Sequence, residues 1–112
     1  MSFKIDSVQN YFDTLDKRFV ADASGGVDAT YQFTMKGDGG GTWHVVVKDG
    51  GMTVNEGPCD SPDSTIECKK ASDWVKIVNG DMSGMRAVMM RKMKVGGNVT
   101  LARKMQQMFP TA

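Results

Sequence analysis

Only a few side chains in this sequence have the type and the spacing that catalysis requires. The one histidine, His44, could act as a general base, but no serine or cysteine has the sequence context of a triad nucleophile. His44 sits on the polar side of a strand pattern, which favours a solvent-facing position. A small enzyme that uses His44 or Asp73 as its base therefore stays an alternative. The sequence shows no paired titratable group that would support it.

Metal and phosphate chemistry have even less support. Cys59, Cys68 and His44 are too few to supply a zinc site built from Cys and His alone, so we predict two free thiols, no metal and no cofactor. The stretch "KGDGGGT" lacks the Gly-Lys-Ser/Thr ending of a phosphate-binding loop and lies between two strand patterns. Its Asp-Gly and Gly-Gly pairs predict a hairpin connection.

Methionine is concentrated in one quarter of the chain. Residues 81–110 contain seven of the ten methionines. The methionine side chain is flexible and polarisable, which suits a surface that must fit more than one shape. These residues could fill a solid core, where methionine and leucine exchange readily, or they could line an apolar cavity.

Length and composition fit one domain. The 112 residues, 40% of them hydrophobic, are enough to bury a single core, so we predict one domain over residues 1–112. No segment approaches membrane-spanning length, and the first ten residues lack the apolar stretch of a signal peptide. We therefore predict a cytoplasmic protein. The net charge of +1 does not indicate nucleic acid, and we predict no nucleic-acid partner.

The first half of the chain predicts a helix followed by an antiparallel meander. Apolar residues spaced by three and four predict a helical face made of Ile5, Val8, Phe12, Leu15 and Phe19. The period then changes to two, and strands are predicted over residues 29–36, 42–48, 51–56 and 63–68.

The second half predicts short helices around a fifth strand. Helices are expected over residues 73–80, from residue 83 onward, and from residue 99 to Pro110, with a strand over residues 92–97 between the last two. Four residues are suited to cap the helices at their N-termini, namely Ser7, Ser72, Ser83 and Asn98. Because each element has one apolar side, the simplest arrangement is a sheet with helices on one face.

Charge is divided unevenly along the chain. Residues 1–80 carry eight lysines and arginines against twelve acidic residues, whereas residues 81–112 carry six against Asp81 alone. Such runs are usually the solvated faces of helices and strands. They also flank the methionine-rich segment, so we predict contact with an anionic membrane through Arg86, Arg91, Lys92, Lys94, Arg103 and Lys104.

In the order and spacing of its segments, the sequence resembles the sterol carrier protein 2 domain family over nearly the whole chain. The C-terminal half has an Asp-led strand, a "DW" helix that ends at glycine, and a strand of alternating lysine and apolar residues before the last helix. The matching positions are Asp63, Thr65, Ile66, Asp73, Trp74, Gly80, Met93, Val95, Gly97 and Asn98. The chain departs from the family in having Arg91 where glycine is usual.

The resemblance implies a mixed α/β fold and a lipid ligand. The expected fold is a five-stranded, mainly antiparallel sheet with helices over one face and an apolar tunnel between them. Within it the family holds sterols, fatty acids or acyl-CoA without catalysis. The side chains that we expect to contact lipid are Phe33, Trp74, Val78, Met82, Met85, Met89, Met90, Met105, Met108 and Phe109.

The leading hypothesis is therefore non-enzymatic binding and intracellular transfer of lipids. Besides the small enzyme, a further alternative is an accessory module that holds substrate for a partner enzyme, because domains of this family also occur inside larger chains.

Overall fold

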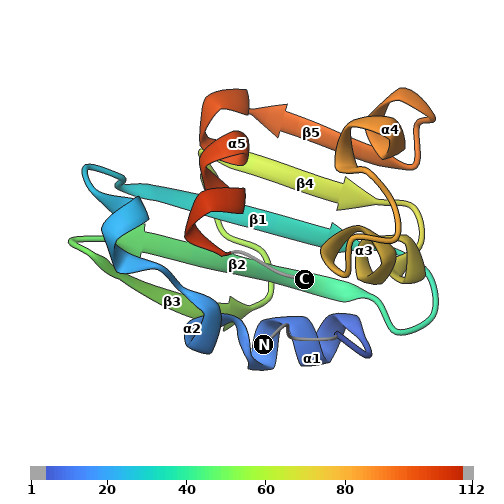
Figure 1. The fold of residues 1–112 in the computed structure, drawn as a ribbon, viewed down its shortest axis with the longest axis horizontal. Helices are drawn as coiled ribbons and strands as arrows, with labels where there is room; N and C mark the ends of the chain where they lie inside the picture. Colours follow the sequence, from blue (N-terminus) through green and yellow to red (C-terminus); the bar gives the residue numbers. More distant parts are fainter. Residues whose placement is uncertain (1–4, 110–112) are drawn as a thin grey trace.

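A five-stranded sheet forms one layer of the molecule. The computed structural model describes residues 5–109 (Figure 1). The strands are β1 (Ala29–Met35), β2 (Gly41–Lys48), β3 (Gly51–Glu56), β4 (Ser64–Cys68) and β5 (Met93–Gly97). Their order is β3-β2-β1-β4-β5, with β1 and β4 parallel and the other three pairs antiparallel. The predicted meander and the mainly antiparallel sheet are confirmed.

The inner face of the sheet carries the apolar half of each alternating pattern. Tyr31, Phe33 and Met35 on β1 are buried, and Trp43, Val45 and Val47 on β2 are buried beside them. Ile66 and Cys68 extend this face across β4. The register of the strands places their apolar residues side by side on one face, so the predicted alternation becomes one continuous buried surface.

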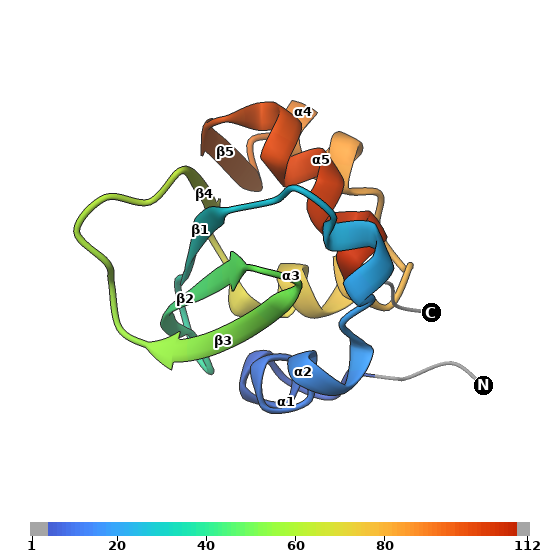
Figure 2. The same cartoon turned by 90° about the vertical axis from the view of Figure 1, so that its left-hand side faces the viewer.

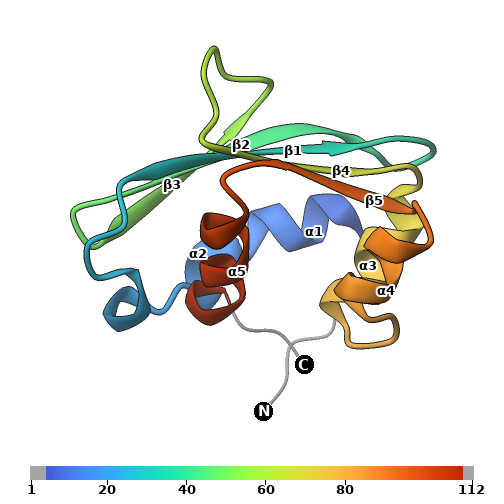
Figure 3. The ribbon, with the colours of Figure 1, turned by 90° about the horizontal axis from the view of Figure 1, so that it is seen from above.

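All the helices cover that inner face. They are α1 (Val8–Asp13), α2 (Leu15–Arg18), the 3-10 helix η1 (Ala21–Ser24), α3 (Ala71–Val78), α4 (Gly84–Met89) and α5 (Val99–Met108). Figure 3 shows them on one side of the sheet, while Figure 2 shows the loop over residues 57–63 projecting from the other side. The predicted two-layer arrangement is confirmed.

Three predicted N-caps are confirmed and one is wrong. The side chains of Ser7, Ser83 and Asn98 accept hydrogen bonds from backbone amides three residues further on. Helix α3 starts at Ala71, so Ser72 lies inside its first turn. The Ala71 amide donates instead to the Lys36 carbonyl at 2.8 Å, a tertiary hydrogen bond that fixes the start of this helix.

The predicted first helix is interrupted at Thr14. The Thr14 hydroxyl donates to the Asn10 carbonyl at 2.8 Å, and its backbone leaves the helical region before α2 begins at Leu15. Phe19 follows the end of α2 and packs against Phe109, with ring centroids 5.4 Å apart. This contact of Phe19 connects the N-terminal helices to the end of α5. Pro110, predicted to end that helix, lies outside the described residues.

Candidate functional site

Most of the predicted contact residues lie between the sheet and the helices. Six of the ten belong to the buried core, namely Phe33, Trp74, Val78, Met105, Met108 and Phe109. Trp74 connects the two layers, because its ring lies 5.7 Å from Phe33 on the sheet and 5.4 Å from Tyr11 on α1. The structure brings these six side chains together in one apolar layer. The tunnel implied by the family resemblance stays a prediction.

The methionines of α4 do not belong to that layer. Met85 and Met89 are each 77% exposed and Met90 is 54% exposed, whereas Met82, before the helix, is half-buried. The expectation that Met85, Met89 and Met90 point into the interior is wrong. Helix α4 is only six residues long and is anchored through Ala87, which is fully buried, so its other side chains face solvent. Figure 3 places α4 at one end of the helical layer.

A buried arginine borders the apolar layer. Arg18 is 5% exposed, and its guanidinium lies over the Tyr11 ring at 4.5 Å. Its Nη2 donates to the Tyr11 carbonyl at 2.6 Å. Its Nε and Nη1 have no hydrogen-bond partner among the residues that the structure describes, and neither has the indole nitrogen of Trp74. Trp74 also packs against the Tyr11 ring, so all three unpaired donors belong to residues that contact Tyr11.

The burial of Arg18 was not predictable from residue type, because arginine in a short helix is normally solvent-facing. A weak indication was present, since Arg18 follows Leu15 by three residues and so shares the apolar face of the helix. The neighbouring residues place Arg18 next to α5. The Val20 amide donates to the Met108 carbonyl at 2.7 Å, and Phe19 packs on Phe109.

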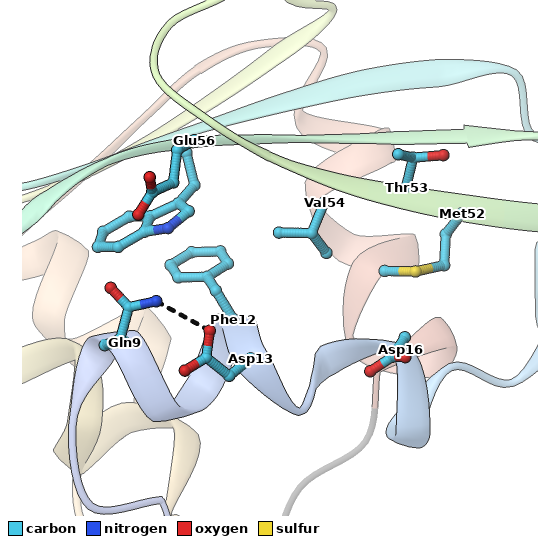
Figure 4. A pocket seen from close by; sticks show the side chains of 9 residues that line it. Gln9, Phe12, Asp13, Asp16, Met52, Thr53, Val54 and Glu56 are labelled. Carbon is cyan, nitrogen blue, oxygen red and sulfur yellow. Dashed lines mark hydrogen bonds between the residues drawn. The ribbon is translucent and has the colours of Figure 1, made fainter.

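A hollow lies at the edge of the sheet formed by β3. It has a volume of about 460 Å³ and separates α1 and α2 from β3 (Figure 4). Its lining is Gln9, Phe12, Asp13, Asp16, Trp43, Met52, Thr53, Val54 and Glu56. None of the ten predicted contact residues lines it. Met52 and Val54 belong to the strand predicted over residues 51–56, and nothing in the sequence placed the first helix opposite them.

The two bases considered for an enzyme lie on opposite sides of the sheet. His44 is half-buried on the outer face, where its Nδ1 lies 2.9 Å from the Gly57 carbonyl oxygen. A carbonyl only accepts, so this nitrogen carries the proton. Asp73 is buried at the start of α3, on the inner side. The sheet therefore separates the two side chains, and they cannot act on one bound substrate together.

Burial keeps two tyrosines and one cysteine of the core neutral. Burial is the main cause that raises the pKa of Tyr11, Tyr31 and the Cys68 thiol to about 12 each. In Cys68 the nearby Asp73 adds to the effect, and at neutral pH the thiol is a small apolar group of the core. Cys59 is half-buried in the outer loop, where its amide donates to the Gln32 side chain at 3.1 Å.

The cations of the last third surround α4 and α5. Arg86 and Arg91 are exposed at α4, and Arg103 and Lys104 are exposed on α5. Arg91 has a φ of 61°, in the left-handed region that favours glycine. This backbone conformation agrees with the glycine that the family resemblance leads us to expect at this position. None of the helices in the described part of the chain combines the length and the apolar character that crossing a bilayer requires.

Comparison with known proteins identifies the family. The model of the SCP-2 sterol transfer family matches residues 12–110, and this range contains all five strands and the core helices α3 and α5. The chain belongs to the SCP-2 sterol transfer family. Solved structures agree with this at the level of the fold. The sterol carrier protein domain 2 of Helicoverpa armigera superposes with a TM-score of 0.74 at 24% identity, covering 89% of this chain and 83% of that one.

Other SCP-2 structures and longer proteins share the fold. Sterol carrier protein 2 from Yarrowia lipolytica, in its apo form, has a TM-score of 0.71 at 21% identity, with 99% and 100% of the two chains covered. The inverting sec-alkylsulfatase Pisa1 from Pseudomonas sp. reaches 0.79 at 17% identity, covering 92% of this chain and 16% of that enzyme.

Curated relatives contain the SCP-2 domain as a part. The chain is 36% identical over 82 residues to hydroxysteroid dehydrogenase-like protein 2 of Mus musculus, covering 72% of this chain and 16% of that protein. The Homo sapiens protein of the same name is 30% identical over 104 residues, covering 92% and 25%. The chain thus spans between a sixth and a quarter of the length of these relatives.

Proposed function

We propose that this SCP-2 domain binds lipids and transfers them between membranes in the cytoplasm, without catalysing a reaction on them. The observation that carries the proposal is the family match over residues 12–110. The apolar layer of six predicted contact residues supports it. Burying roughly 300 Å² of an acyl chain contributes about 7 kcal/mol before the cost of association, which suffices for micromolar binding.

A lipid must displace side chains to enter this layer. Met105 and Met108 are the flexible members, and both lie on α5 beside the N-terminal segment that follows α2. Methionine can change rotamer at little cost, so the layer can open there without breaking the sheet. The tail then lies between α5 and the inner face of the sheet, against Phe33.

The proposed anchor of the lipid head is Arg18. Two of its guanidinium nitrogens and the indole nitrogen of Trp74 lack partners among residues 5–109. All three are donors, so the group that satisfies them must accept hydrogen bonds. A fatty-acid carboxylate fits best, because a guanidinium binds it through two parallel hydrogen bonds. Among the family's lipids, we therefore propose a fatty acid as the ligand of this chain.

The exposed face of α4 is the proposed membrane contact. Met85 and Met89 are one helical turn apart, and Arg86 and Arg91 lie beside them. Burying a methionine side chain in the interface contributes roughly 1.5–3 kcal/mol, and each cation near an anionic surface adds up to about 1 kcal/mol. The face thus joins the two attractions that hold a protein reversibly on anionic lipid.

Native mass spectrometry and vesicle transfer test the proposal. The purified chain should retain a fatty acid, and its transfer of a fluorescent fatty acid should be faster from anionic than from neutral vesicles. Transfer should slow with added salt and in the paired variants Met85→Ser with Met89→Ser and Arg86→Glu with Arg91→Glu. The control Lys17→Glu with Lys48→Glu makes the same charge change at exposed positions outside α4. Absence of lipid binding would refute the function, whereas equal rates from both vesicle types would refute only the docking surface.

An accessory role is the second candidate. Its support is that the curated relatives have dehydrogenase-like names and are four to six times longer than the matched segment. In that case the domain would hold a lipid substrate for another enzyme. Faster turnover of a dilute lipid substrate by a dehydrogenase fused to this chain, abolished by Arg18→Met, would support the accessory role.

A further inference from the structure

The hollow between α1, α2 and β3 differs in character from the proposed lipid layer. Its inner wall is apolar and comes from Phe12, Trp43, Met52 and Val54. The rim carries three exposed carboxylates, and the lining residues in the described part of the chain include no lysine or arginine. Figure 4 shows Met52 and Val54 pointing from the strand toward the helix, with Asp13 and Asp16 on the opposite side.

The wall offers a flat surface to an apolar chain. The rings of Phe12 and Trp43 are stacked, with centroids 4.5 Å apart and planes 15° from parallel. Met52 and Val54 are half-buried on the inner side of β3, an edge strand of the sheet. The volume of about 460 Å³ falls within the range of small-molecule pockets. A ligand that covered these side chains would remove apolar area from water and gain affinity from it.

The rim determines which head group fits. Gln9 donates to Asp13 at 2.8 Å, which orients this carboxylate at the rim and leaves its charge in place. Glu56 lies opposite Trp43 in the register of β2 and β3, and Asp16 lies on α2. Three negative charges around an apolar wall repel a carboxylate or phosphate head and attract a cation.

We propose that this pocket binds a single-chain organic cation, an alkyl amine or quaternary ammonium. Its chain lies against the Phe12–Trp43 wall and its cation at the carboxylate rim. The site goes beyond the proposed lipid transfer, because none of the ten predicted contact residues lines it and it selects the opposite head charge from Arg18.

The test compares three probes with the same chain and different heads: decyltrimethylammonium, 1-decanol and decanoate. An exposed ion pair adds between about 1.4-fold and fivefold, so three carboxylates should give the cation roughly tenfold tighter binding than decanoate. Binding at this pocket is followed by the methyl resonance of Met52 in the full chain, because decanoate is also expected to occupy the site at Arg18. Raising the salt should reduce the preference, because exposed charges are screened.

Neutral variants locate the preference in the rim. Asp13→Asn, Asp16→Asn and Glu56→Gln together should bring cation and decanoate to within about threefold, while 1-decanol binding stays unchanged. The control variant Asp22→Asn, Asp28→Asn and Asp60→Asn removes the same charge from exposed positions outside the pocket.

The proposal is overturned if decanoate shifts the Met52 methyl resonance at concentrations as low as the cation does, or if the rim variant keeps the preference. It is also overturned if none of the three probes shifts the Met52 methyl. These results are independent of fatty-acid transfer, which is measured separately with vesicles.

Discussion

Replacing the buried Arg18 by methionine should separate ligand binding from fold stability. The change removes the hydrogen bond to the Tyr11 carbonyl, which is worth about 1.5–3 kcal/mol for a charged donor, and the contact with the Tyr11 ring, worth about 0.5–2 kcal/mol. It also removes two buried donors without described partners, each of which costs about 1–3 kcal/mol. Methionine keeps most of the aliphatic stem, so no large cavity forms.

The stabilising contacts that are lost and the cost of the unpaired donors that is removed cancel to within about 2 kcal/mol. The Arg18→Met chain should therefore unfold at nearly the urea concentration of the native chain. Affinity should change much more. Truncating one partner of a buried charge pair costs about 2–5 kcal/mol, which predicts at least about thirtyfold weaker palmitate binding. Binding of hexadecanol, which has the same chain without the charge, should stay within about threefold.

Displacement of a fluorescent fatty acid and urea denaturation, followed by circular dichroism, provide the two measurements. The control is Lys17→Met, which removes a cation from the exposed neighbouring position of α2. An Arg18→Met chain that keeps its palmitate affinity would refute the proposed anchor. A loss of more than about 3 kcal/mol in the free energy of unfolding would show instead that Arg18 serves the fold.

Three further predictions concern the core. Met105→Trp should abolish fatty-acid uptake, because it fills the layer beside α5, whereas Met89→Trp, at an exposed position, should leave uptake within about twofold. Gly97→Ala should lower the free energy of unfolding by at least about 2 kcal/mol more than Gly50→Ala in denaturant titrations. Both glycines have positive φ, but only at Gly97 would a Cβ lie 2.5 Å from a backbone oxygen. Burial raises the pKa of the Cys68 thiol to about 12, so with rising pH the unfolded chain loses this proton before the folded chain does. The free energy of unfolding should therefore fall from about pH 9 upward, and it should fall less steeply in Cys68→Ala.

The sheet was predictable because its residues repeat with a period of two between glycine-rich turns. Each strand predicted from that pattern is present, and the alternation of buried and exposed positions is complete along β1. Helix starts were predictable where a side chain caps the helix, as at Asn98, and not where a tertiary hydrogen bond sets the start, as at Ala71. The break at Thr14 was missed because the apolar period continues through it.

The candidate site was predictable only in part, because residue type does not say which face of a short helix is covered. Met105 and Met108 lie on a ten-residue helix packed along the sheet, and their burial follows from the apolar stripe. Met85 and Met89 also have a helical spacing, but on a six-residue helix at the end of the layer, where nothing in the described chain covers them. Arg18 is the converse case, a charged residue that the fold buries.

These exceptions occur at positions where a lipid carrier requires residues that folding alone does not require. A stable core gains nothing from a guanidinium with unpaired donors, and a soluble surface gains nothing from exposed methionines. A ligand head would satisfy the donors of Arg18, and a bilayer would cover Met85 and Met89. Local sequence patterns describe the folded chain alone, and so they fail at the positions where a second molecule would complete the environment. Bound fatty acid should therefore protect the Arg18 guanidinium from chemical modification, and bound anionic vesicles should protect the Met89 thioether from oxidation. Neither ligand should affect the other side chain.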